Sequence, residues 1–318
     1  MRRGSSGISC LLAIDKPLGL SSHDVVNRVR RILGERRVGH AGTLDPAASG
    51  VLVVGVGQAT RLLGMLTLDD KRYVARIAFG TQTTTDDAEG EPIRTAPIPD
   101  RLADEDFART AVSALVGDHD QLPPAYSAIS VGGRRAYEMA RSGDQVELEA
   151  RHVTIYDAQL LSLDHGEGVL VWDCAFHVSK GTYIRSIARD LGTSLGTAAH
   201  LCGLQRVSSG PIGLARCLSL EQLELAGAGQ VMEHALNPTI ALGHPIHRLS
   251  EGDLQSVMVG RPFACPSTVS DRGEMRPARP GEPVSLVSEG RLMGVWERRG
   301  SRLCSKATFP EGVGGVRP

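Results

Sequence analysis

The chain has 318 residues, of which 41% are hydrophobic and 22% are charged, and its formal net charge at pH 7 is −1. This length can bury one large core and a smaller second domain, and a charge this close to neutral does not by itself indicate a nucleic-acid partner. No apolar run approaches the roughly 18 residues of a membrane span, and the apolar stretch at the N-terminus is too short for a signal peptide, so we expect a cytoplasmic protein without a membrane segment.

The distribution of charge and of cysteine along the chain narrows the kinds of site that the protein can contain. Residues 1–80 hold 12 Lys and Arg against 6 Asp and Glu, whereas residues 81–125 hold 3 against 10. Positive charge is therefore concentrated in the first quarter of the chain. The 6 cysteines are scattered without a C-x-x-C pair or a histidine at ligand spacing, which argues against a zinc site and against a disulfide framework.

The first predicted elements are a helix and two strands. Residues 21–24 resemble a capping box, and apolar residues then recur at helical spacing, so we expect an amphipathic helix over 22–33. The run 51–56 is β-branched and bounded by glycines, which is typical of a buried strand. Residues 72–79 alternate and predict a second strand, with one face formed by Tyr73, Ala75, Ile77 and Phe79.

The middle of the chain continues to mix helices and strands. The acidic, proline-containing stretch 82–106 predicts a solvated connection that leads to a helix at about 104–116. Residues 150–163 and 168–178 predict a hairpin, and a helix opens at Gly181-Thr182. One face of the second hairpin strand should carry Leu170, Trp172, Cys174, Phe176 and Val178. Because the elements follow no regular βαβ rhythm, we expect an α+β domain.

The composition changes near Gly243-His244-Pro245. Beyond that point, residues 250–259 predict a short helix and residues 283–297 a hairpin that turns at 288–290. We therefore expect a small β-rich C-terminal domain over 244–310. The Gly- and Pro-rich end of the chain, 311–318, is expected to be a flexible tail.

The strongest chemical motif is the block Gly39 to Gly50. Pro46 disfavours the α conformation at Asp45, and the glycines of the block allow tight turns and close approach of a ligand, so Asp45 is expected on a fixed, non-helical loop. The alternative is that Asp45 caps a helix that begins at Pro46.

Three further blocks combine tyrosine with basic residues. Lys71-Arg72-Tyr73 opens an alternating strand and is equally typical of an ordinary core tyrosine. The segment 123–141 contains prolines, glycines, two tyrosines and three arginines; it fits either a loop that closes over a polyanion or a surface turn followed by an exposed helix. Tyr183 and Arg185 can share a site only if the chain is extended there, with the helix beginning a residue or two later; otherwise Arg185 pairs with a surface acid.

Together and in this order, the blocks resemble the bacterial TruB family of tRNA pseudouridine synthases. The resemblance covers roughly residues 12–215 and rests on DKP at 15–17, GHAGTLDP at 39–46, GQATR at 57–61, Lys71-x-Tyr73, PPAYSAI at 123–129, SKGTYIRSIARDLG at 179–192 and AHL to LQR at 199–206. It implies a catalytic domain at 1–243, with a mixed, mostly antiparallel sheet, flanking helices and an RNA-binding insertion at about 120–150. It also implies that the domain at 244–310 is PUA-like.

The resemblance further implies an activity: isomerisation of uridine 55 in the T loop of tRNA to pseudouridine. No cofactor, no metal and no obligate protein partner are expected, and the T stem-loop of tRNA is the expected partner. Asp45 resembles the catalytic aspartate, Arg185 the arginine that pairs with it, Tyr73 the tyrosine that stacks on the target base, and Tyr183 a second active-site tyrosine. Whether the carboxylate attacks the sugar or abstracts a sugar proton stays open.

Other residues carry weaker expectations. His40 resembles a histidine that helps hold the flipped-out T loop, and Leu204 an apolar residue of the pocket. The expected contacts to the RNA backbone are Lys16, Arg134, Arg135, Arg141 and Lys180.

Three rival functions remain to be separated from this one. The first is an RNA-binding module without catalysis. The second is the guide-RNA-dependent branch of the family, against which the lack of long basic extensions counts. The third is a glycoside or nucleoside hydrolase, which requires a second carboxylate as acid or base, and none in the matched blocks is an obvious candidate.

Overall fold

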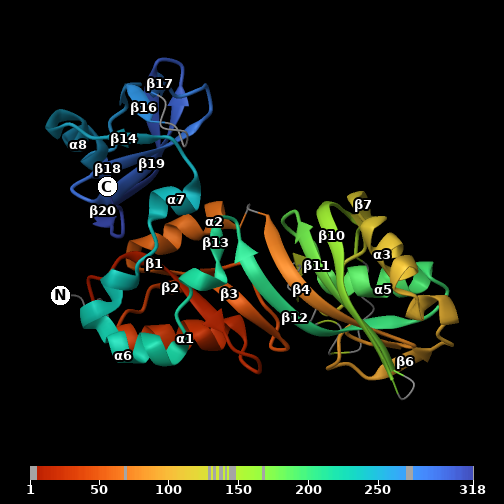
Figure 1. Ribbon diagram of the computed structural model, residues 1–318. Coiled ribbons are helices and arrows are strands. Elements are labelled where there is room, and N and C mark those ends of the chain that lie inside the picture. Colours follow the sequence, from red (N-terminus) through yellow and green to blue (C-terminus); the bar gives the residue numbers. More distant parts are fainter. Residues whose placement is uncertain are drawn as a thin grey trace. The chain divides into compact units, whose positions relative to one another are not determined.

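The computed structural model describes residues 6–67, 70–127, 130, 131, 134, 135, 139, 142, 148–166, 169–269 and 275–317. The chain forms two compact units, coloured along the sequence in Figure 1. Unit 1 consists of Met1–Pro46, Gly50–Leu68 and Ser209–Pro318, and unit 2 consists of Ala47–Ser49 and Asp69–Ser208. Among the described residues, no helix combines the length and the apolar character that a membrane crossing demands.

The N-terminal part of unit 1 is a small sheet covered by a helix. Strand β3 (Ala48–Val56) pairs antiparallel with β1 (Cys10–Lys16) and with β2 (Val38–Ala41). Helix α1 (Ser22–Leu33) has the predicted bounds. Its capping box is confirmed, because Ser21 and Asp24 exchange side-chain and backbone hydrogen bonds, and Gly34 ends it in the left-handed conformation at φ 61°.

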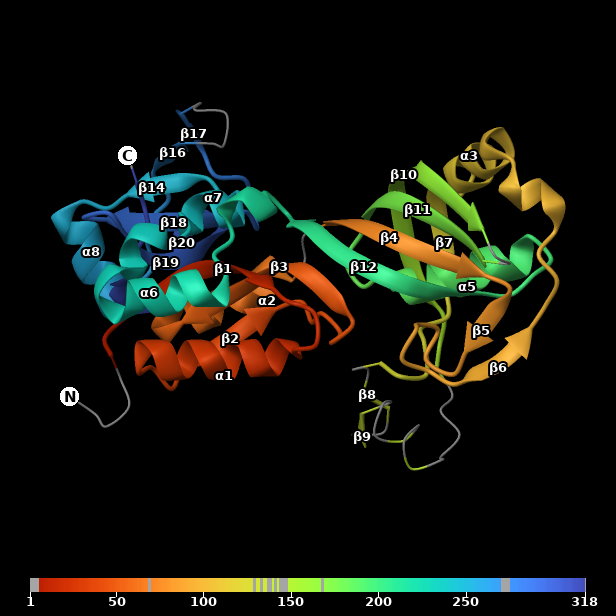
Figure 2. The ribbon, with the colours of Figure 1, turned by 60° about the horizontal axis from the view of Figure 1, so that its bottom comes forward.

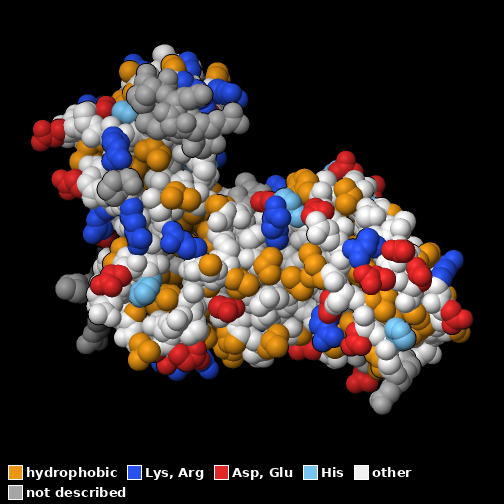
Figure 3. All heavy atoms as spheres, in the orientation of Figure 1, with side chains coloured by type: hydrophobic (Ala, Val, Ile, Leu, Met, Phe, Trp, Pro, Cys, Tyr) orange, Lys and Arg blue, Asp and Glu red, His pale blue; other side chains and the backbone are white. Residues whose placement is uncertain are grey.

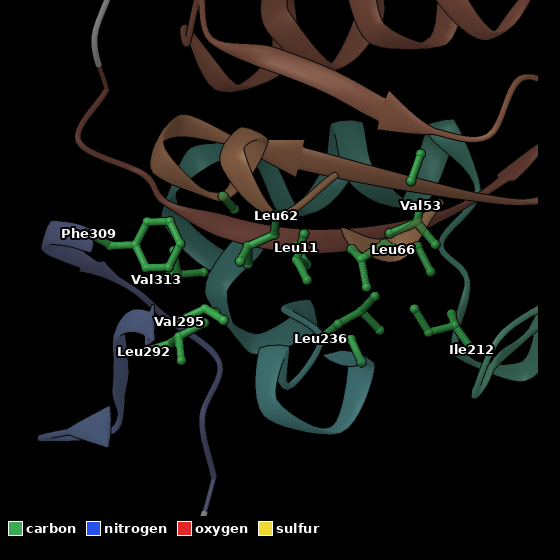
Figure 4. Close-up of a cluster of buried hydrophobic side chains, with 14 of the residues drawn as sticks. Leu11, Val53, Leu62, Leu66, Ile212, Leu236, Leu292, Val295, Phe309 and Val313 are labelled. Atoms are coloured by element: carbon green, nitrogen blue, oxygen red, sulfur yellow. The ribbon is translucent and has the colours of Figure 1, made fainter. Parts of the chain in front are cut away.

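Strand β3 is buried on both faces, which explains its uninterrupted apolar run. Leu52, Val54 and Val56 pack with the apolar stripe of α1. Val51 and Val53 face a second cluster, to which the short elements η1 (Gly57–Leu62) and α2 (Leu63–Leu66) contribute. Figure 4 shows this second cluster, in which Leu11, Val53, Leu62 and Leu66 meet side chains from the C-terminal strands, namely Leu292, Val295, Phe309 and Val313.

The remainder of unit 1 begins with short helical elements and ends with a sheet. After β13 (Ile212–Gly213) come η3 (Leu214–Arg216), α6 (Leu220–Gln230), η4 (Val231–His234) and α7 (Pro238–Leu242). The C-terminal sheet has the strand order β15-β20-β19-β18-β14-β16-β17. Its strands are β14 (Ile246–Arg248), β15 (Phe263–Ala264), β16 (Ser267–Val269), β17 (Met275–Pro277), β18 (Pro283–Ser288), β19 (Arg291–Arg299) and β20 (Arg302–Val313), and its helix is α8 (Glu251–Met258). The predicted helix at 250–259 and the hairpin turning at 288–290 are therefore confirmed.

The C-terminal strands do not form a compact unit of their own. They have a private cluster that includes Val284, Leu286 and Trp296, but they also share the core of Figure 4 with β1 and β3. The boundary expected at 243/244 consequently stays a prediction.

The end of the chain differs from the predicted flexible tail. Residues 311–313 complete β20, and the Gly314 amide donates to the Ser9 carbonyl at 2.8 Å. Arg317 donates to the Glu233 carbonyl at 2.8 Å. The segment is held because Val313 is buried in the shared core, which the Gly- and Pro-rich composition did not reveal.

Unit 2 is built on a sheet in which β4, β11, β10 and β7 pair antiparallel, and the predicted α+β class is confirmed. Its strands follow the order β12 (Ala199–Ser209), β4 (Lys71–Phe79), β11 (Val169–Val178), β10 (Arg151–Gly166) and β7 (Gly117–Gln121). Figure 2 shows the helices α3 (Glu105–Ser113) and α5 (Ile184–Ser194) beside these strands. Two small hairpins, β5 (Thr81–Thr83) with β6 (Pro92–Thr95) and β8 (Ser130–Val131) with β9 (Arg134–Arg135), and the turn η2 (Asp100–Ala103) complete the unit.

The predicted faces of β4 and β11 are confirmed. All nine side chains named for them are buried, and Tyr73 lies opposite Phe176 in the register of the two strands. Trp172 anchors this face, because its ring contacts Phe79 at 4.7 Å between centroids and its Nε1 donates to the Leu102 carbonyl at 3.0 Å. Tyr73 is thus a side chain on a rigid strand rather than on a loop.

Candidate active site

Asp45 lies in unit 1 on the irregular segment that joins β2 to β3. The chain turns there at Gly42, whose φ of 74° favours glycine, and forms another turn at Pro46 before β3 begins. No helix begins at Pro46, so the alternative in which Asp45 is a helix cap is wrong. The side chain of Asp45 is half-buried.

The residue before Asp45 is held by a single hydroxyl. Ser22 Oγ accepts a hydrogen bond from the Leu44 amide at 2.8 Å and donates one to the Leu44 carbonyl at 2.9 Å. Both residues are buried, so this hydroxyl satisfies two backbone groups that water does not reach. Because Ser22 stands in the first turn of a capped helix, the position of α1 fixes the peptide that leads into Asp45.

Pro46, the residue after Asp45, is held by residues of the segment 16–22, which also contains Ser22. The Pro46 carbonyl accepts from the Gly19 amide at 2.9 Å and from Lys16 Nζ at 3.5 Å. Lys16 Nζ also donates to the carbonyls of Pro17 at 2.9 Å and Leu20 at 2.6 Å, and its side chain is 0% exposed. The predicted contact of Lys16 with RNA is therefore wrong, because a buried ammonium that is bound to backbone carbonyls holds the loop instead of meeting a phosphate.

The other predicted catalytic residues lie in unit 2. Tyr73 is on β4, and Tyr183 is the residue before α5, with extended angles of φ −99° and ψ 112°. Since the helix begins at Ile184, the condition under which Tyr183 and Arg185 can share a site is met. The side-chain amide of Gln121 holds Tyr183 on both sides, because its Oε1 accepts from the Tyr183 amide at 2.8 Å and its Nε2 donates to the Tyr183 carbonyl at 3.1 Å.

Arg185 is buried and makes several directed contacts. Its Nη1 donates to the Thr85 carbonyl at 3.0 Å and lies 3.4 Å from Asp87 Oδ2, and its Nη2 donates to the Tyr126 carbonyl at 2.9 Å. Asp87 in turn accepts from the Thr85 hydroxyl and from the Glu89 amide. The guanidinium is thereby fixed in its plane by acceptors from two separate segments. Its pairing with Asp45 stays a prediction.

A second ion pair lies one helical turn further along α5. Arg189 Nη1 lies 2.9 Å from Asp86 Oδ2, and Arg189 Nη2 donates to the Leu122 carbonyl at 2.8 Å. Burial raises the pKa of the Asp86 carboxyl, against the opposing effects of the Arg189 guanidinium and of a hydrogen bond from Gln82.

These ion pairs contradict the predicted solvated connection at Asp86 and Asp87 only, because residues 88, 89 and 91–95 of the same stretch are exposed as expected. Asp86 and Asp87 are each 6% exposed. The signal that sequence reasoning missed is the match between two consecutive acids and two arginines spaced i, i+4 on a predicted helix.

The remaining predicted residues lie on several elements. His40 is half-buried on β2, Leu204 is half-buried on β12, and Lys180 is exposed in the turn before Tyr183. Arg134 is exposed on β9, and Arg135 is its neighbour on that strand. Arg141 lies outside the described residues. The described residues contain no group of three His, Cys, Asp or Glu side chains that could hold a metal ion.

The surface of unit 2 is mixed in charge on the face drawn in Figure 3. Acidic and basic side chains are interspersed there over α3 and β7, where Glu105, Asp106 and Arg109 are exposed. A phosphate backbone requires local positive charge, and such a surface does not supply it.

Two family models together match most of the chain. The TruB family pseudouridylate synthase N-terminal domain matches residues 30–184, and the tRNA pseudouridylate synthase B C-terminal domain matches residues 185–241. The chain is 44% identical over 281 residues to tRNA pseudouridine synthase B of Mycobacterium sp. (strain KMS), with 88% of this chain and 92% of that protein covered. It is 44% identical over 294 residues to tRNA pseudouridine synthase B of Thermobifida fusca (strain YX), with 91% and 94% covered.

Solved structures share the fold at lower identity. The chain is similar to a chain of the archaeal box H/ACA sRNP Nop10-Cbf5 complex, with a TM-score of 0.67, 22% identity, and 95% of this chain and 86% of that chain covered. It is also similar to a chain of a Cbf5-Nop10-Gar1 complex, with a TM-score of 0.65, 22% identity, and 98% and 88% covered. At this identity the likeness concerns the fold alone.

Proposed function

The chain belongs to the TruB family and isomerises uridine 55 of tRNA to pseudouridine, and we propose that Asp45 is the essential carboxylate of this reaction. The observation that supports Asp45 most directly is its setting. Both neighbouring residues, Leu44 and Pro46, are fastened to the segment 16–22, so Asp45 lies on a loop held on either side. A catalytic group has to be held within a fraction of an ångström of its productive position, and hydrogen bonds on either side of Asp45 favour such placement.

The reaction requires a nucleophile or base but no redox partner. The bond from ribose C1′ to uracil N1 breaks, the uracil rotates, and C1′ bonds to C5, which finally loses its proton. An ionised carboxylate can attack C1′ as the nucleophile of a retaining glycosidase does, or it can abstract a sugar proton to give a glycal. Both routes need Asp45 ionised and rigidly placed.

Arg185 is proposed as the positive partner of Asp45. A guanidinium next to a carboxylate favours its ionised form and fixes its orientation. The contacts of Arg185 with Thr85, Tyr126 and Asp87 support this role, because they hold the guanidinium plane without a proton transfer. Arginine keeps its proton throughout the physiological pH range, so the role of Arg185 is electrostatic.

The two tyrosines are proposed to receive the base. A uridine stacked in the T loop is out of reach of any carboxylate, so it has to be flipped out at a cost of a few kcal/mol. Stacking on an aromatic face returns about 1–3 kcal/mol per base. Tyr73 on the rigid strand β4 and Tyr183 in the extended residue before α5 are supported for this purpose by their fixed backbones.

Recognition of the tRNA is proposed to rest on the T stem-loop. Lys180 and Arg134 are exposed and are proposed as contacts to the backbone phosphates, and Leu204 and His40 as neighbours of the flipped nucleotide. We also propose that no protein partner and no guide RNA are required, since the curated relatives that match over nine-tenths of their length are tRNA pseudouridine synthases B.

The test is turnover by the purified chain alone on an unmodified tRNA transcript, with pseudouridine mapped by position. Asp45→Asn is expected to bind the transcript with unchanged Kd and to form no pseudouridine. Asp106→Asn, which removes an exposed carboxylate from α3, is the matched control and should leave turnover unchanged.

Each rival predicts a different result. Normal turnover by Asp45→Asn would remove Asp45 from the chemistry. Release of free uracil would indicate a hydrolase, tRNA binding without any modified product would indicate a binding module, and turnover only after a guide RNA is added would indicate the guide-dependent branch.

A further inference from the structure

Helix α5 is fastened to the loop 84–90 by two neighbouring ion pairs within unit 2. Arg185 and Arg189 are spaced i, i+4, so their side chains leave the same face of the helix. Their partners Asp87 and Asp86 are consecutive residues of the loop. All four side chains are largely buried, with exposed fractions of 8% for both partners of the first pair and of 15% for the arginine and 9% for the aspartate of the second.

The loop adopts an unusual backbone conformation to present both carboxylates. Asp86 has φ 58°, in the left-handed region that residues other than glycine seldom occupy, although Asp and Asn tolerate it best. Backbone bonds to β12 hold the loop on its other side, because the Leu201 amide donates to the Asp86 carbonyl and the Ala88 amide to the Leu201 carbonyl, each at 3.0 Å. This turn allows two adjacent side chains to reach two arginines of one helix.

The free-energy cost of burying these four charges indicates that the ion pairs orient side chains rather than stabilise the fold. Taking charges out of water costs several kcal/mol per ion before pairing, and replacing a buried ion pair by neutral groups is often harmless to stability. Burial also raises the pKa of the Asp86 carboxyl, which means that burial disfavours its charged form relative to its neutral form. A second buried pair beside the first therefore needs an explanation other than stability.

The explanation lies in what Arg189 and Asp86 hold in place. Their pair fixes the loop whose next residue, Asp87, contacts Arg185 and whose preceding residue, Thr85, gives Arg185 a carbonyl acceptor. Arg189 also donates to the Leu122 carbonyl, at the start of the segment that ends in the Tyr126 carbonyl, another acceptor of Arg185. Thr85, Asp87 and Tyr126, which all accept from or pair with Arg185, thus belong to two segments that Arg189 also holds.

We propose that Asp86 and Arg189 form a positioning pair for Arg185, and that they set the orientation of its guanidinium in the isomerisation. This inference rests on the proposed function, in which Arg185 accompanies the catalytic carboxylate. In this proposal Asp86 and Arg189 have no role at the reacting atoms themselves. Their effect is transmitted through the loop 84–90 and through the segment 122–126.

The first variant removes the charge and keeps the backbone. Asn occupies the left-handed region as readily as Asp, so Asp86→Asn loses the ion pair without losing the turn. We expect kcat to fall about tenfold or more, as small displacements of a catalytic group do, while KM for tRNA stays unchanged. Wild-type kcat in Asp86→Asn would overturn the proposal.

A second variant guards against simple misfolding. Asp86→Asn combined with Arg189→Gln removes both charges and leaves no buried ion unpaired, so this protein is expected to fold. Its kcat should be as low as that of Asp86→Asn alone. The matched control is Arg76→Gln, which breaks the exposed pair of Arg76 with Asp173 at 2.9 Å in the same unit and should leave kcat and KM unchanged.

The decisive experiment is a double-mutant cycle in kcat with Arg185→Lys. If Asp86 acts through Arg185, then Asp86→Asn lowers kcat in the wild-type background but changes it less than about twofold in the Arg185→Lys background. Two independent, multiplying losses would overturn the proposal, because a general structural defect acts regardless of residue 185.

The outcome also separates this inference from the proposed function. Reduced turnover in Arg185→Lys together with unchanged turnover in Asp86→Asn contradicts the positioning pair alone. Unchanged turnover in Arg185→Lys contradicts the proposed role of Arg185 and the positioning pair with it.

Discussion

The Asp45 loop of unit 1 and the Arg185 environment of unit 2 are held by different means. Around Asp45 the bonds go to the backbone, from the Ser22 hydroxyl to Leu44 and from Lys16 and Gly19 to Pro46. Around Arg185 the bonds go to the side chain itself. The bonds to Leu44 and Pro46 therefore fix the course of the backbone on either side of Asp45, whereas the bonds to Arg185 fix the orientation of its guanidinium.

We expect the largest effect from a substitution of Ser22, whose hydroxyl holds the backbone before Asp45. Ser22→Ala removes one hydroxyl and leaves both backbone groups of Leu44 buried without that partner, which costs about 1–3 kcal/mol per unsatisfied group. We expect a loss of about 2–6 kcal/mol in the free energy of unfolding for the two groups. We also expect a fall in kcat of about tenfold or more, because the peptide before Asp45 is released. Chemical denaturation and single-turnover rates check both.

The neighbouring serine supplies the control for Ser22. Ser21→Ala removes the half-buried N-cap of α1 and should cost about 1 kcal/mol of stability, with kcat unchanged. Equal losses of kcat in the two variants would show that the helix as a whole, and not the bond to Leu44, sets the loop.

A substitution of Gln121 tests whether hydrogen bonds to the backbone also position a residue in unit 2, namely Tyr183. Gln121→Leu keeps the volume but removes both bonds to the Tyr183 backbone, and we expect a stability loss of about 1–2 kcal/mol. If Tyr183 contacts the base, the fall in kcat should be a few-fold and smaller than that of Ser22→Ala, because Tyr183 supports the base rather than the bond that breaks. Unchanged kcat at reduced stability would remove Tyr183 from the site.

The smallest expected effect concerns the stability of the doubly neutral variant Asp86→Asn with Arg189→Gln. Its free energy of unfolding at pH 7 should lie within about 1 kcal/mol of the wild type or above it, because a buried ion pair is weak evidence for stability. A loss of more than about 3 kcal/mol would show that the pair holds the fold.

The difference in free energy of unfolding between this variant and the wild type should depend on pH with a defined sign. Burial raises the pKa of Asp86 above its ordinary value of 3.8, so the folded protein binds the proton more tightly than the unfolded chain does. The cost of the Asp86 charge is therefore present at neutral pH and disappears as the pH falls below about 4. Any advantage of the variant should shrink over that range in denaturation curves.

Much of the fold followed from local patterns. The helix 22–33 and its capping box depend on spacing within one turn, and the faces of β4 and β11 depend on alternation, so both were correct. The placement of Asp45 on a non-helical loop followed from Pro46 and the flanking glycines. The extended conformation at Tyr183 was predicted only as a condition for residues 183 and 185 to share a site, and the structure meets this condition.

What failed depended on partners far away in the chain. Lys16 looked like an RNA contact until its ammonium was found among backbone carbonyls, and residues 311–317 looked frayed until Val313 was found in the core. Composition could not separate these cases, because a lysine or a glycine-rich end has the same local sequence whether it is buried or solvated.

The amino-acid sequence by itself determined the helices, the strand faces and the chemistry available at residues 45, 73, 183 and 185, because these depend on side-chain type and on local spacing. Only the tertiary structure decided that Asp86 and Asp87 are buried partners of arginines about a hundred positions away. The physical reason is that the residue type alone determines which groups can ionise. The exposure of a carboxylate to solvent and its positively charged partner depend on which distant segments the fold brings beside it.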